Sequence, residues 1–91
     1  MAQSQLHRPG PIPEAPAARH LGDLARSDRT WSVYMETRTQ GETVAGRLHF
    51  VVGTSYRTTG WIFLEWHERD IVSRFNEFSP AELWQLVESL N

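Results

Sequence analysis

The segment Gly60–Trp66 places large apolar side chains at four consecutive positions, from Trp61 to Leu64. Because successive side chains of a strand point to opposite faces, an extended segment of this composition is apolar on both faces. Each face then needs cover, either from other parts of the chain or from a partner. This requirement constrains the fold more than any other stretch of the sequence.

Two strands are predicted before this segment. Residues 31–38 and residues 43–52 alternate apolar and polar side chains, which is typical of strands with one buried face. A Gln-Gly dipeptide at 40–41 predicts a two-residue hairpin turn between them, since glycine adopts the positive φ that such turns need. That turn pairs Val33 with Leu48, so that apolar residues meet apolar residues on the inner face.

The third predicted strand covers residues 57–65 and follows a predicted three-residue turn at 53–55. With this turn, the even-numbered residues of the strand face the inner side of the sheet, and the odd-numbered residues face outward. The two outward aromatic side chains are those of Trp61 and Phe63. As the last strand of a simple meander, the segment is also an edge strand, which is an aggregation hazard unless another strand pairs with it.

Two helices are predicted after the sheet. Apolar residues at positions 71, 72, 75 and 78 have helical spacing and predict a helix over 68–77, with a fourth strand as the alternative. Ser79, Pro80 and Glu82 form a capping-box pattern with proline at the first helical position, which predicts a helix over 79–90. The sequence therefore predicts an α+β fold of order β-β-β-α-α, in which a three-stranded antiparallel meander carries both helices on one face.

Residues 1–29 are predicted to be a flexible, proline-rich leader, and residues 30–91 a single small α+β domain. Four prolines between positions 9 and 16 prevent a helix or strand from propagating, and this part of the leader has few apolar residues to bury. Farther along, the apolar spacing allows a short helix over 16–27.

The composition excludes several classes of function. The chain has 91 residues, no cysteine and a formal net charge of -2, which argues against disulfides, thiolate metal sites and general nucleic-acid binding. No apolar run reaches the ~20 residues of a membrane-spanning helix, and a cytoplasmic location is expected. The polar cluster at 65–70 lacks the spacing of a metal site or a catalytic pair, so that no catalytic residue, cofactor or metal is predicted.

The predicted outer face of the sheet holds the residues best suited to binding. Tyr34, Arg47 and Trp61 are predicted to lie side by side across the strands, with Phe63 in the next row. Either the leader folds over this face, or the face binds protein, or it stacks single-stranded nucleic acid. Aromatic residues and arginine are enriched in protein interfaces, which favours a non-enzymatic protein-protein interaction module. It would act as a homodimer, paired through the third strand or the outer face, or as a small accessory subunit.

Overall fold

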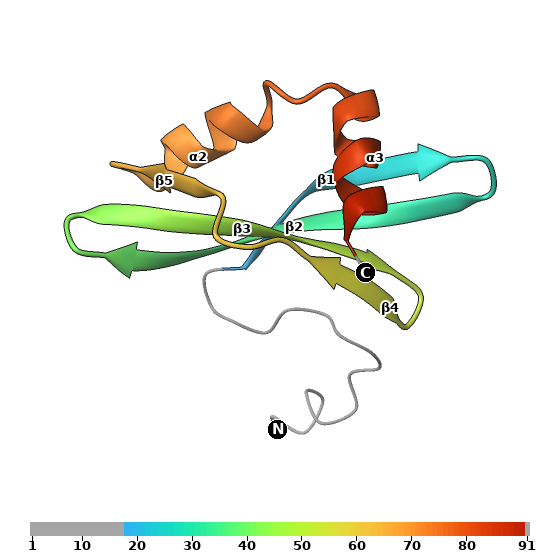
Figure 1. The fold of residues 1–91 in the computed structure, drawn as a ribbon, viewed down its shortest axis with the longest axis horizontal. Coiled ribbons are helices and arrows are strands. Elements are labelled where there is room, and N and C mark those ends of the chain that lie inside the picture. The colour runs from blue at the N-terminus through green and yellow to red at the C-terminus, as the bar shows by residue number, and fades with distance from the viewer. Residues whose placement is uncertain (1–17, 91) are drawn as a thin grey trace.

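The computed structural model describes residues 18–90, which form one antiparallel sheet with two helices on one of its faces (Figure 1). The elements, in chain order, are β1 (Arg19–Arg26), β2 (Arg29–Gln40), β3 (Thr43–Val52), β4 (Ser55–Thr58), β5 (Phe63–Glu65), α2 (Glu68–Phe75) and α3 (Pro80–Ser89). The strand order is β1-β2-β3-β4, and β5 pairs with β3 along the same edge as β4. The predicted α+β class is confirmed, and the predicted count of three strands is too low.

Strand β1 occupies part of the segment that the sequence assigns to the leader and its short helix, so the helix prediction is wrong from Arg19 to Arg26. Leu24 lies opposite Trp31 of β2, and both side chains are buried. Helical spacing is overridden here because the long β2 offers hydrogen-bonding partners, while a bulge at Leu21 absorbs one extra residue. Leu24 packs on the inner face and therefore does not cover the outer one. The predicted flexibility of residues 1–17 lies outside the described residues.

Two-residue turns connect the first four strands, and each turn has a positive φ at its first residue. These residues are Ser27 (55°), Gly41 (62°) and Gly53 (58°). The predicted two-residue turn after β2 is confirmed, although it lies one position later, at residues 41–42. Val33 consequently pairs with Phe50 instead of Leu48. This displacement by two positions keeps every side chain of β3 on its predicted face.

The predicted three-residue turn after β3 is wrong. Val52 pairs with Ser55, so the turn contains only Gly53 and Thr54. A turn shorter by one residue moves the side chains of β4 to the face opposite the predicted one. Position 53 suits glycine here, because two-residue hairpin turns favour positive φ at their first residue.

The predicted strand over 57–65 is in fact two short strands, β4 and β5, with an irregular segment between them. The Thr59 amide donates to the Leu48 carbonyl at 2.9 Å, and the Thr59 hydroxyl accepts from the Leu48 amide at 3.0 Å. The chain then leaves β3 and rejoins it at Phe63, opposite Gly46. This interruption breaks the continuous edge on which the predicted strand-to-strand homodimer depends.

Both predicted helices are present on the inner face. The segment 68–75 is helical, so the fourth-strand alternative is wrong. Helix α3 begins with the predicted capping box: the Ser79 hydroxyl accepts from the Glu82 amide at 3.1 Å, and the Glu82 carboxylate accepts from the Ser79 amide at 2.8 Å. Pro80 stands at the start of the helix, where a missing N–H costs nothing. No helix in the described part of the chain has the length and apolar character needed to cross a membrane.

The core lies between the inner face of the sheet and the two helices. Its most buried large side chains come from β2, β3 and both helices, namely Phe50, Met35, Leu48, Ile71, Val33 and Val87. Burial of these side chains supplies the main driving force for folding a chain of this size. The outer face has no helix over it within residues 18–90 (Figure 1).

Candidate functional site

The predicted site residue Phe63 lies in the core, so its predicted exposure is wrong. Its side chain is only 7% exposed, and its ring packs edge-to-face against Phe78 with the ring centroids 6.3 Å apart. Phe63 faces inward because β5 pairs it with Gly46, the position that the predicted register pairs with Ile62. Phe63 therefore stabilises the fold and is not available to a partner in the folded chain.

Arg47 and Trp61, two other predicted site residues, contact each other on the outer face. The guanidinium carbon of Arg47 lies 4.4 Å from the Trp61 ring centroid, and that of Arg38 lies 4.2 Å from it. Cation–π contacts of this kind contribute about 0.5–1 kcal/mol each at partly exposed positions. The irregular backbone after Thr59 allows Trp61 to reach the outer face. Its ring is thus occupied by two arginines of its own chain.

Glu36 connects Arg47 to the buried His49 at the centre of the outer face. Its Oε1 accepts a hydrogen bond from Arg47 Nε at 2.9 Å and lies 2.8 Å from His49 Nε2, while His49 Nδ1 lies 2.9 Å from the Thr58 hydroxyl. Burial by itself would raise the pKa of the Glu36 carboxyl. The hydrogen bonds and charges of His49 and Arg47 outweigh burial and hold that pKa below its ordinary value. The resulting network ties β2, β3 and β4 together.

Glu36→Gln is expected to destabilise the fold at neutral pH by about 1–3 kcal/mol, because it removes a charged hydrogen-bond acceptor. A lowered folded-state pKa stabilises the fold above the unfolded-state pKa, and this contribution is lost as the pH falls through the folded-state value. The stability difference between wild type and variant should therefore shrink below about pH 4.5. Urea unfolding across that range measures it, with the exposed Glu42→Gln as control. A difference that stays constant or grows in acid would contradict this account.

Tyr34 does not join Arg47 and Trp61. It pairs with His49 across β2 and β3, and its ring centroid lies 5.2 Å from that of His20 in β1. Arg47 instead pairs with Glu36. The predicted row of three side chains is therefore broken by the two-position displacement at the β2–β3 turn.

Three large apolar side chains in β5 and directly beside it in sequence are exposed, and we call Ile62, Leu64 and Trp66 the β5 apolar row. Their exposed fractions are 48%, 53% and 65%. Leu64 lies opposite Ala45 on the outer face. The sequence predicts that Ile62 and Leu64 face the core. This prediction is wrong, because the register that turns Phe63 inward turns its two neighbours outward. Only Tyr56 among the other large apolar residues described is comparably exposed, so apolar exposure concentrates on the short segment 62–66 that contains β5.

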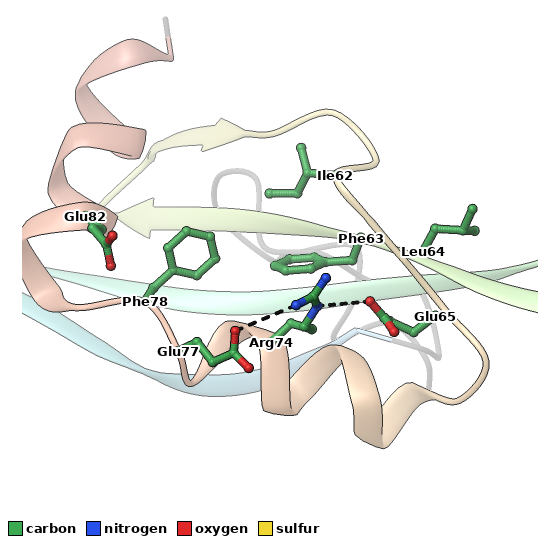
Figure 2. Close-up of a pocket in the computed structure, with 8 residues that line it drawn as sticks. All are labelled: Ile62, Phe63, Leu64, Glu65, Arg74, Glu77, Phe78 and Glu82. Carbon is green, nitrogen blue, oxygen red and sulfur yellow. Dashed lines mark hydrogen bonds and ion pairs between the residues drawn. The ribbon is translucent and has the colours of Figure 1, made fainter.

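A pocket of about 520 Å³ opens beside β5 (Figure 2). Residues 62–65 form one wall, and the end of α2 and the start of α3 form the other. Figure 2 shows Phe63 and Glu65 pointing toward the helices, whereas Ile62 and Leu64 point away from them. Because side chains from both faces of the strand line it, the pocket follows the edge of β5 that faces away from β3.

The rim of this pocket is acidic. Arg74 Nε donates to the Glu65 carboxylate at 3.1 Å, and Arg74 Nη1 lies 3.8 Å from a Glu77 oxygen. Glu82 also lines the pocket, and its carboxylate accepts from the Ser79 amide. The lining thus carries three carboxylates and one guanidinium, which leaves an excess of negative charge around an apolar floor.

A second hollow, of about 280 Å³, lies beside the β1–β2 turn and α3. Arg57 Nη1 donates to the Val87 carbonyl at 2.8 Å, and Arg26 Nη1 donates to Glu88 at 2.9 Å. The same arginines lie over aromatic rings, Arg57 over Trp31 and Arg26 over Trp84. These contacts attach α3 to the sheet, which gives the arginines a structural role.

The polar segment at 65–70 forms ion pairs with other parts of the chain. Glu65 pairs with Arg74, and Glu68 pairs with Arg19 at 3.3 Å. Within residues 18–90, no three His, Cys, Asp or Glu side chains converge in a way that could hold a metal ion. The ion pairs of Glu65 and Glu68 link β5 to α2 and α2 to β1.

Comparison with known proteins assigns no family to this chain. No protein-family model matches it, and no curated protein or solved structure shows significant similarity. Its function is therefore inferred from the geometry of β5 and its surroundings.

Proposed function

We propose that this chain is a non-enzymatic protein-interaction module whose contact surface is the β5 apolar row. The observation that carries the proposal is the exposure of three large apolar side chains, each by about half or more, within the short edge strand β5 and at the positions directly before and after it. Contiguous apolar exposure on a small soluble domain marks interaction surfaces, and tryptophan is enriched among the residues that dominate binding energy. The partner is a second copy or another protein to which the chain is an accessory subunit.

This surface replaces the one predicted around Tyr34, Arg47, Trp61 and Phe63. Phe63 is buried and cannot contact a partner. Arg47 and Trp61 contact each other, and Arg47 also bonds to Glu36. A base-stacking platform requires free aromatic rings, so the single-stranded nucleic-acid alternative has less support than protein binding. Within residues 18–90, by contrast, the side chains of the β5 apolar row are about half exposed or more, and Trp66 has no arginine over its ring.

Site-specific photocrosslinking tests the proposal. The full chain, expressed in its native cells with p-benzoylphenylalanine in place of Leu64 or Trp66, is expected to give discrete adducts of higher mass on irradiation. Mass spectrometry of the adducts identifies the partner as a second copy or another protein. The control carries the same group at Asp28, an exposed residue in the β1–β2 turn at the far end of the sheet (Figure 1). Absence of adducts from positions 64 and 66, or the same adducts from position 28, would reject the proposal.

A further inference from the structure

We propose that the free edge of β5 and its pocket bind an extended, basic segment of a different protein, which joins the sheet as an additional strand. This inference rests on the proposed function, because it uses the same strand. It goes further by naming the conformation and the charge of the partner segment.

The backbone of β5 has two edges, and β3 pairs with one of them. Among the described strands, β5 pairs with β3 alone. In an antiparallel strand, the N–H and C=O groups of alternate residues point to opposite edges. Some of the backbone groups of residues 62–65 therefore point away from β3, toward the pocket. Unpaired groups of this kind are the template on which an extended peptide adds to a sheet.

The pocket supplies contacts for the side chains of such a strand. An added strand alternates its side chains between the two faces, as β5 itself does. On the inner side these side chains would reach the pocket floor at Phe63 and Phe78. On the outer side they would lie beside Ile62 and Leu64. Apolar residues in the bound segment would thus be accommodated on both faces.

The negative charge of the pocket rim indicates which charged side chains the bound partner segment should carry. The pocket lining carries three carboxylates, of Glu65, Glu77 and Glu82, and one cation, Arg74, which pairs with Glu65 and Glu77. Glu77 is 69% exposed at its side chain, so it is accessible to a charged partner. Complementary charges select partners and orient them more than they add affinity. Lysine or arginine in the bound segment therefore matches this rim, and acidic residues do not.

The same charges disfavour a second copy of the chain as the occupant. Antiparallel pairing of two β5 edges in one continuous sheet requires a twofold axis perpendicular to the sheet, which places both helix layers on the same side. The two rims would then meet, with the carboxylates of Glu65, Glu77 and Glu82 opposed by their own counterparts. Juxtaposed like charges oppose association. The occupant is thus a segment of another protein with the opposite charge.

A displayed library of random twelve-residue peptides, selected on the folded full chain, tests this inference. We expect the enriched peptides to combine apolar residues at alternating positions with lysine or arginine. An enriched peptide carrying fluorescein is then titrated with the protein and followed by fluorescence anisotropy. Glu77→Lys should weaken its binding about tenfold or more, because the rim then repels the peptide. Asp28→Lys, with the same charge change in the distant β1–β2 turn, should leave it unchanged.

N-methylation of the peptide backbone tests strand addition itself. Methyl groups on one alternating set of residues should abolish binding, because that set donates to the edge of β5, whereas methyl groups on the other set should leave binding intact. Equal effects of both sets, no enriched sequence, enrichment of acidic peptides, or equal affinity for the Glu77→Lys variant would each overturn the inference. Crosslinks from Leu64 to a second copy alone would also overturn it, yet they would uphold the proposed function.

Discussion

Phe63→Ala is expected to destabilise the fold by about 3–5 kcal/mol, whereas Leu64→Ala should cost less than about 1 kcal/mol. The two residues are neighbours on one short strand, but Phe63 is 7% exposed and Leu64 is 53% exposed. Truncation of Phe63 leaves a cavity against Phe78 and removes apolar area from the core. Truncation of Leu64 removes area that is largely in contact with water. Urea unfolding followed by tryptophan fluorescence measures both values.

This pair of variants also decides between the two registers of β5. In the register predicted from sequence, Leu64 is buried and Phe63 is exposed, so the order of the two losses would be reversed. If Phe63→Ala does not fold, Phe63→Leu replaces it in the comparison. Phe63→Leu should lower the free energy of unfolding by about 1–2 kcal/mol, which is still more than Leu64→Ala should. A larger loss at Leu64 would show that β5 pairs as the sequence predicts.

The elements whose signals are local were predictable from the sequence. The capping box at Ser79 and Glu82 involves residues three apart, and no distant part of the chain competes for them. Helix α2 was predicted from its apolar spacing, and Ile71 indeed packs into the core. The α+β class follows from these helices together with the alternation in β2 and β3. None of these predictions needs the strand register.

Strand β1 was not predictable in the same way, because its stability depends on a partner. Residues 19–26 contain a glycine and few apolar side chains, so their own preference is weak. Pairing with β2 and burial of Leu24 decide their conformation. Contacts distant in sequence thus override a short helical pattern, as is usual for segments of this length.

The predicted row of Tyr34, Arg47 and Trp61 failed at the β2–β3 turn, and the predicted exposure of Phe63 failed in the segment after Gly53. A register error of one residue after Gly53 moves the side chains of β4 to the wrong face, and β5 also pairs with β3 one residue away from the predicted register. A sequence signal for the shorter turn existed, since glycine at the first loop position favours a two-residue turn over a three-residue one. Trp61 nevertheless reaches the outer face, because the backbone leaves the β3 ladder after Thr59. That interruption has no alternation or turn pattern from which the sequence alone could predict it.

Gly46→Val is expected to destabilise the fold by about 1–3 kcal/mol, because the position is already in close contact with α2. A Cβ at Gly46 would lie 3.1 Å from both Cδ1 and Cγ2 of Ile71 and 3.5 Å from Cβ of Phe63. Ile71 is fully buried, so its side chain has little room to move. Gly22→Val is the matched control, since a Cβ at that position in β1 meets no atom within 4 Å. Urea unfolding should show little loss for the control.

A double-mutant cycle shows whether this loss arises from the contact with Ile71. Ile71→Ala alone should cost about 2–5 kcal/mol through the cavity that it leaves. Combined with Gly46→Val, it should cost less than the sum of the two single losses by at least about 1 kcal/mol, because the valine fills the space that the isoleucine vacates. Additive losses would mean that Gly46→Val acts elsewhere in the sheet. A positive coupling would establish that α2 lies directly over β3, the packing that buries Phe63 and leaves the β5 apolar row outside.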